Sequence, residues 1–196
     1  MKNRAISFLI AGALLTPVLA FAHAGTLADH MHTRFFDGLL HPLTGADHLL
    51  AMLAVGVWSA LAIRPVWLAP LSFVAMLLTG ALAAQAGWVL PGVEPMIAAS
   101  LLALGLLVAT RAKLPHMAAA ALCGAFAFFH GAAHGAELGG TSAAWAALAG
   151  MVLTTAALHA SGIGLGAWAL ARRQWLTRMG GTAVALLGTG LLWRLA

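Results

Sequence analysis

Long apolar stretches separated by short connections dominate this chain of 196 residues. Each stretch is close to the roughly 20 residues that cross a bilayer as an α-helix. They are predicted at 42–63, 66–86, 93–110, 115–137, 143–170 and 179–195. Because the connections are too short for a separate soluble domain, the pattern predicts an all-α membrane protein. Its expected architecture is a six-transmembrane-helix bundle that forms a single domain over residues 42–196.

The start of the chain has a different pattern. Lys2 and Arg4 precede an apolar run, which ends in Ala-Phe-Ala at 20–22. This order is typical of a secretory signal peptide with an A-x-A cleavage site, although a retained first transmembrane helix would also account for the apolar run. We predict a cleavable signal peptide at 1–22 and a periplasmic N-terminal segment at 23–41.

Composition supports a membrane protein and excludes other classes. The chain is 62% hydrophobic and 8% charged, whereas soluble domains have about 25% charged residues. The formal net charge is +5, but the basic residues are too few and too scattered for a nucleic-acid-binding surface. The expected surroundings are therefore the lipid bilayer, with no nucleic-acid partner. The single cysteine, Cys123, excludes an internal disulfide.

Basic residues gather on one side of the predicted topology. If the mature N-terminus is exported, the first, third and fifth connections are cytoplasmic. These connections contain Arg64, Arg111, Lys113, Arg172, Arg173 and Arg178. Of the predicted mature chain, Arg34 and Arg194 fall on the outer side. This distribution follows the positive-inside rule and predicts a multi-pass cytoplasmic-membrane protein with a periplasmic N-terminus.

A first polar motif, His-Pro-Leu-Thr-Gly-Ala-Asp-His, begins at His41 and leads into the first predicted span. Pro42 suits the first turn of a helix, which would place His41 at or near its N-cap. His41 and His48 would then share one face, about 10 Å apart along the axis. An ionisable pair such as Asp47 and His48 costs several kcal/mol inside a membrane unless it is paired or bound. Asp47 has two candidate roles, as a metal ligand or as a group that orients an imidazole.

A second polar motif, Phe-His-Gly-Ala-Ala-His-Gly-Ala-Glu, ends the fourth predicted span at 129–137. At about 100° per residue, His130, His134 and Glu137 fall on one narrow stripe of a helix. Two histidines four residues apart have Cβ atoms about 6 Å apart, a separation that imidazoles can close onto one cation. The glycine after each histidine belongs to a small-residue repeat that allows close helix packing.

Depth in the membrane predicts that the two motifs meet. At about 1.5 Å per residue, His48 lies about 10 Å below the outer surface, and His130 and His134 lie about 10 Å and 5 Å below it. A single membrane histidine usually bonds to a neighbouring backbone group, but two clusters at one depth favour a metal site. Mixed imidazole and carboxylate ligation suits Ni²⁺, Co²⁺, Zn²⁺ and Fe²⁺. The predicted ligand is therefore a divalent transition-metal ion.

The two motifs together resemble the HupE/UreJ family of nickel/cobalt permeases. The matching residues are H-P-x-x-G-x-D-H at 41–48 and F-H-G-x-x-H-G-x-E at 129–137, and the signal, polar start and six spans extend the resemblance over the whole chain. The resemblance implies a permease domain for secondary uptake of Ni²⁺ and/or Co²⁺ across a bacterial inner membrane. By the same resemblance, the residues that engage the metal are His41, Asp47, His48, His130, His134 and Glu137.

The resemblance also implies that the ion is bound transiently as cargo, with no prosthetic group. Hydrogenase, urease or cobalamin pathways are the candidate users of the metal. A homo-oligomer is a further candidate for the assembly of the chain. Two other functions compete with transport: an intramembrane metal-dependent hydrolase, although the fourth span lacks H-E-x-x-H, and a haem-binding membrane protein. We expect no enzymatic activity.

Several further residues carry weaker expectations. His159 is a candidate for a later station on the ion path, with helix packing as an equal alternative. Met52 offers a thioether one turn beyond His48, but packing is the favoured interpretation. Three polar residues near the outer end are candidates to complete the vestibule: Gln85, Glu94 and Ser100.

Overall fold

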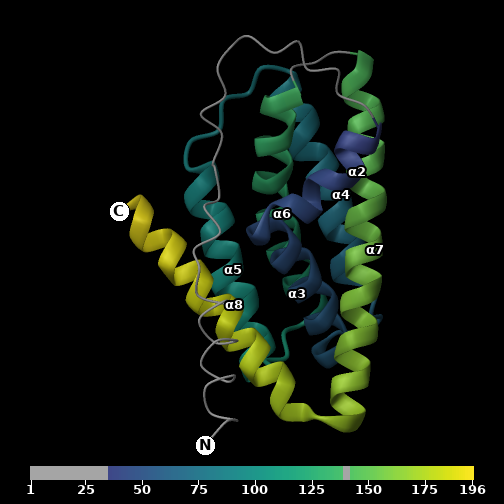
Figure 1. Cartoon of the computed structure of the whole chain (residues 1–196), viewed down its shortest axis with the longest axis vertical. Helices are drawn as coiled ribbons and strands as arrows, with labels where there is room; N and C mark the ends of the chain where they lie inside the picture. The colour runs from purple at the N-terminus through teal and green to yellow at the C-terminus, as the bar shows by residue number, and fades with distance from the viewer. Residues whose placement is uncertain (1–34, 139–141) are drawn as a thin grey trace, which may run out of the picture. The chain divides into compact units, whose positions relative to one another are not determined.

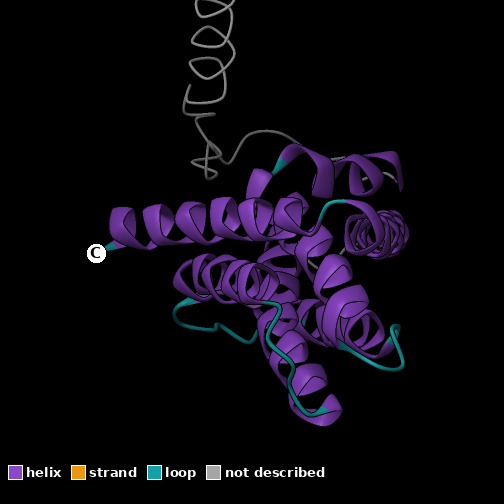
Figure 2. Cartoon of the chain, turned by 90° about the horizontal axis from the view of Figure 1, so that it is seen from below, coloured by secondary structure: helices purple, strands orange, loops and turns teal. Residues whose placement is uncertain are grey.

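The computed structural model describes residues 35–138 and 142–196, which form a set of packed helices (Figure 1). In chain order the helices are α2 (Phe35–Thr44), α3 (Ala46–Ala62), α4 (Leu68–Gln85), α5 (Val93–Thr110), α6 (His116–Leu138), α7 (Ser142–Arg172) and α8 (Gln174–Leu195). No strand occurs within the described ranges (Figure 2), so the predicted all-α class is confirmed there. The predicted signal peptide at 1–22 and most of the segment at 23–41 lie outside the described residues.

The first predicted span is divided into two helices. Gly45 connects α2 to α3, and the two helices are bent by 83° relative to one another. Pro42 lies inside α2 instead of starting a helix, so the predicted N-cap position of His41 is wrong. At the break, Gly45 takes an extended conformation and the Thr44 hydroxyl donates to the His41 carbonyl oxygen at 2.8 Å. That carbonyl keeps a hydrogen-bond donor where α2 ends.

Four helical segments are long and apolar enough to cross a membrane: α4, α5, α6 and residues Ala144–Arg172 of α7. The α2–α3 pair meets the same requirement only as one bent unit, which raises the number to five at most. The sixth predicted span, 179–195, lies within α8, which does not meet it. These helices agree with a multi-pass membrane protein, while the six-span count stays a prediction.

α6 packs closely along α4, and glycines make this approach possible. A Cβ at Gly131 would fall on the carbonyl group of Leu77, and one at Gly135 would fall on the carbonyl group of Ala81. The small-residue repeat predicted from the sequence therefore does bring another backbone against α6. This contact fixes the rotation of α6, and the histidine that precedes each glycine is buried.

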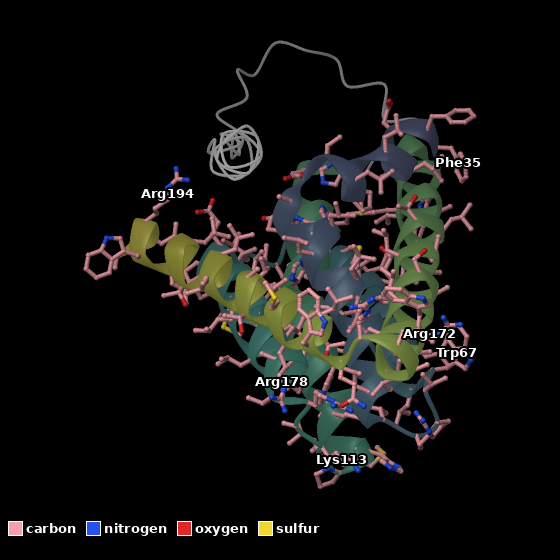
Figure 3. All side chains as sticks on the ribbon, turned by 60° about the horizontal axis from the view of Figure 1, so that its bottom comes forward. Phe35, Trp67, Lys113, Arg172, Arg178 and Arg194 are labelled. Atoms are coloured by element: carbon pink, nitrogen blue, oxygen red, sulfur yellow. The ribbon has the colours of Figure 1, made fainter. Side chains whose placement is uncertain are left out.

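Several basic residues gather toward one end of the described helices, and Arg194 lies away from them (Figure 3). Lys113, Arg172 and Arg178 lie toward this end and Phe35 lies at the other (Figure 3). Arg111 donates a hydrogen bond to the Gln174 side-chain oxygen at 2.9 Å, which ties the end of α5 to the start of α8. In Figure 1, α7 runs from the neighbourhood of α2 down to this basic end.

Candidate metal site

The bend at Gly45 places the two histidines of the first motif side by side. His41 lies in the last turn of α2, and His48 lies near the start of α3. Their ring centroids are 6.1 Å apart, so the separation of about 10 Å expected for one straight helix is wrong. Because the chain changes direction between the two residues, their rings are closer together than they would be along one straight helix.

These two histidines meet the histidine stripe of α6. Ring centroids are 4.7 Å apart for His41 and His134, 4.6 Å for His48 and His134, and 4.9 Å for His48 and His130. His41, His48, His130 and His134 thus form one connected group, which we call the histidine cluster. The structure brings together residues separated by more than 80 positions in the chain, as the equal depths of the two motifs predict.

Glu137 adds a carboxylate at the outer side of the histidine cluster. Its Oε2 atom lies 3.8 Å from His41 Nε2 and 3.9 Å from His134 Nδ1. One ligand atom from each of these three residues lies within 4.8 Å of the others. Ligands on one transition-metal ion at about 2.0–2.2 Å lie about 3 Å apart, so movements of about 1 Å would complete the coordination.

Asp47 contacts His48 instead of converging with the other carboxylate. Its Oδ1 atom accepts the His48 backbone N–H at 2.9 Å and lies 3.0 Å from His48 Nδ1. A proton on Nδ1 satisfies this contact, which leaves the lone pair on Nε2. That Nε2 atom is buried and has no hydrogen-bond partner. Of the two roles predicted for Asp47, the geometry favours orientation of an imidazole over direct ligation.

Ser100 in α5 orients the deepest imidazole in the same manner. Its hydroxyl donates to the Ile97 carbonyl oxygen at 2.6 Å, so its oxygen is left to accept from His130 Nε2 at 3.0 Å. With the proton on Nε2, His130 Nδ1 carries the lone pair, and this atom is buried without a hydrogen-bond partner. The tautomer follows here from the hydrogen-bond network. Both oriented histidines therefore present a free ligand nitrogen.

His134 lies between these two groups. It is 1% exposed, and neither ring nitrogen makes a hydrogen bond. A buried polar group without a partner costs about 1–3 kcal/mol. A cation held by the histidine cluster would satisfy the ring nitrogen of His134 that carries the lone pair. The donor set therefore fits a borderline divalent metal ion.

Comparison with known proteins identifies the family of this chain. Residues 11–191 match the family described as HupE / UreJ protein. The chain is also 42% identical over 194 residues to Protein HupE of Rhizobium leguminosarum bv. viciae, and the match covers 98% of this chain and 99% of that protein. The chain belongs to the HupE/UreJ family. The resemblance drawn from the two motifs is thereby confirmed, whereas no solved structure matches the chain.

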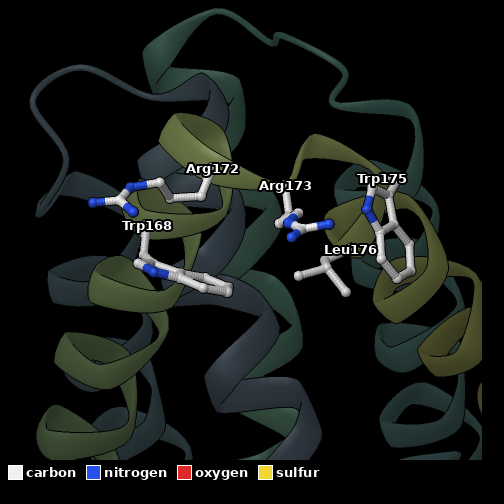
Figure 4. A pocket seen from close by; sticks show the side chains of 5 residues that line it. All are labelled: Trp168, Arg172, Arg173, Trp175 and Leu176. Atoms are coloured by element: carbon white, nitrogen blue, oxygen red, sulfur yellow. The ribbon is translucent and has the colours of Figure 1, made fainter.

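A pocket of about 620 Å³ in this HupE/UreJ family member lies away from the histidine cluster, where α7 meets α8 (Figure 4). Its lining residues are Trp168, Arg172, Arg173, Trp175 and Leu176. Guanidinium and indole groups offer no lone pair to a metal ion. The pocket is therefore not an alternative metal site.

Among the three candidate vestibule residues, Ser100 contacts the histidine cluster directly, through His130. Glu94 lies exposed in the first turn of α5, and the Gln85 amide nitrogen is buried at the end of α4. Sequence reasoning placed Ser100 only near the outer end of the bundle. No local pattern in α5 pairs this serine with a histidine 30 positions away.

Proposed function

We propose that this HupE/UreJ family member is a permease that takes up Ni²⁺ and/or Co²⁺ across the bacterial inner membrane through the histidine cluster. The observation that carries the proposal is the convergence of His41, His134 and Glu137, whose ligand atoms lie within 4.8 Å of one another. The oriented nitrogens of His48 and His130 continue this set into the interior. Membership in the family supports the choice of nickel or cobalt among the metals that imidazole and carboxylate ligands accept.

Exposure within the site decreases in an order that suits capture and stepwise dehydration. The side chains of Glu137 and His41 are 36% and 28% exposed, and that of His48 is 12% exposed. His134 and His130 are 1% and 0% exposed. A hydrated ion would first exchange water for the accessible Glu137 and His41, and then for the buried imidazoles. Conduction requires the binding of the ion at each site to be weak enough for its release to the next site.

The position of the site relative to the basic residues supports uptake from the periplasm. Glu137 lies in the last turn of α6, whereas Lys113, Arg172 and Arg178 lie toward the other end of the helices (Figure 3). Under the positive-inside rule the basic end faces the cytoplasm. The exposed side of the histidine cluster would then open toward the periplasm.

Transport fits the geometry better than haem binding does. Haem ligation by two histidines needs a planar macrocycle between the imidazoles. The imidazoles here contact one another with centroids 4.6–4.9 Å apart, so no gap for a macrocycle separates them. We found no observation that favours the hydrolase.

Uptake of radioactive Ni²⁺ into cells tests the proposal. Wild type should accumulate the ion, and His134→Ala should lower accumulation at least tenfold, because it removes the ligand shared by the outer and inner parts of the site. His116→Ala, an exposed histidine at the start of α6, is the matched control and should accumulate Ni²⁺ as wild type does. Equal uptake by His134→Ala and wild type, at equal protein levels in the membrane, would refute the proposal.

A further inference from the structure

His159 in α7 is a buried polar side chain that the histidine cluster does not include. It is 1% exposed, and neither of its ring nitrogens has a hydrogen-bond partner. A neutral imidazole has one N–H to donate and one lone pair to offer. Packing alone does not account for this residue, because an apolar side chain would fill the same volume without leaving two buried polar atoms unsatisfied.

Buried groups connect the histidine cluster to His159. Met52 lies one turn beyond His48 on α3, and its sulfur accepts a hydrogen bond from the Thr155 hydroxyl at 3.3 Å. Thr155 in turn lies one turn before His159 on the same face of α7. Met52 and Thr155 are both 0% exposed. A thioether and a hydroxyl, both able to ligate a metal, thus lie between the two sites.

The aromatic ring of Phe73 in α4 contacts both sites. Its centroid lies 5.7 Å from that of His130 and 5.1 Å from that of His159. The innermost imidazole of the histidine cluster and the imidazole of His159 are therefore neighbours of the same phenyl ring.

A further buried polar group lies beyond His159 in the direction of the basic end. α3 and α7 touch here, since a Cβ at Gly56 would fall on the His159 carbonyl oxygen. Three residues further along α3, the Ser59 hydroxyl is 0% exposed and has no hydrogen-bond partner. Ser59 thus offers an unsatisfied oxygen about one turn further along α3 than the contact with His159.

We propose that His159 is a transit site for the transported divalent ion, which binds its imidazole after leaving the histidine cluster. This inference rests on the proposed transport function. The chemistry of the surrounding groups, one imidazole with a thioether and a hydroxyl nearby, suits a borderline metal such as Ni²⁺ or Co²⁺ and disfavours Mg²⁺, which prefers oxygen ligands alone.

The variant His159→Leu separates transit from packing, because leucine fills a similar volume without polar atoms. The purified full-length variant should bind Ni²⁺ within twofold of wild type, since the histidine cluster is intact, and its thermal stability should not decrease. Its rate of Ni²⁺ uptake into proteoliposomes should fall at least tenfold. His116→Leu is the matched control, with the same chemical change at an exposed position, and should transport as wild type does.

The variant His159→Cys supplies a second readout that a structural role would not change. A thiolate at this position should retain part of the uptake and shift the preference from Ni²⁺ toward the softer Cd²⁺. Wild-type uptake by His159→Leu would overturn the transit site, as would parallel loss of binding, stability and uptake without a change of selectivity in His159→Cys. If wild type itself took up no Ni²⁺, the proposed function would fail first, and the two failures are thereby distinguished.

Discussion

Replacing Ser100 with alanine should weaken Ni²⁺ binding although Ser100 is not one of the proposed ligands. The Ser100 hydroxyl oxygen accepts a hydrogen bond from His130 Nε2, with 3.0 Å between the two atoms, while the hydroxyl donates to the Ile97 carbonyl oxygen. Without this acceptor, the imidazole of His130 is free to exchange its proton between the two nitrogens and to rotate. Its Nδ1 lone pair is then no longer fixed in one orientation beside the imidazole of His48, whose ring centroid lies 4.9 Å away.

Loss of a group that orients a metal-binding histidine typically lowers metal affinity about 10- to 100-fold, which corresponds to about 1.4–2.7 kcal/mol. The buried His130 N–H left without its partner would separately lower the stability of the protein by about 1–3 kcal/mol. We therefore expect the dissociation constant of Ni²⁺ to rise at least about tenfold in Ser100→Ala.

Equilibrium dialysis of purified full-length protein with radioactive Ni²⁺ measures this constant directly. Ser72→Ala is the matched control, since the Ser72 hydroxyl also bonds to a backbone carbonyl, that of Ala120 at 2.7 Å, but contacts no histidine. It should lose some stability, about 1 kcal/mol, and bind Ni²⁺ as wild type does. Wild-type affinity in Ser100→Ala, or an equal loss of affinity in both variants, would refute the orienting role of Ser100.

Two further changes test the site. Gly45→Ala keeps an allowed backbone, with φ −93° and ψ 115°, but its Cβ would lie 2.9 Å from Asp47 Oδ1 and 3.2 Å from His48 Nδ1. Displacement of this pair should weaken Ni²⁺ binding about tenfold. Gly164→Ala, which adds a Cβ in open space, should not weaken it, and equal affinities of the two variants in dialysis would contradict the prediction. Lowering the pH should reduce Ni²⁺ binding and uptake, because imidazole binds a metal only in its deprotonated form and protons compete with the metal for its lone pair. Uptake that never decreases as the pH falls would argue against imidazole ligation.

The local sequence predicted much of this protein. The apolar stretches indicated an all-helical membrane protein, and the helical repeat placed His130, His134 and Glu137 on one stripe. Equal depth in two spans indicated that the histidines of α3 and α6 meet. These features depend on the spacing of residues within one helix and on the thickness of the bilayer, and both are known before any helix packs against another.

Only the tertiary structure decided the corner at Gly45. The residues between His41 and His48 are compatible with one continuous helix that starts at Pro42, and this is what the local pattern predicted. The structure has an 83° bend instead, which brings the two rings within 6.1 Å of one another. The choice between a straight and a broken helix depends on where α2 packs, since α2 lies against α7, a helix that begins about 100 residues later in the chain.

The residues that contact the histidines likewise could not be predicted from the sequence. Ser100 meets His130 because α5 and α6 face one another, and His159 meets Phe73 because α7 and α4 do. A repeat of 3.6 residues fixes the angle of a side chain around its own helix, but it carries no information about which face of another helix lies opposite. That pairing is set by close backbone contacts among several helices, such as Gly131 against Leu77, and it exists only once all of them are packed.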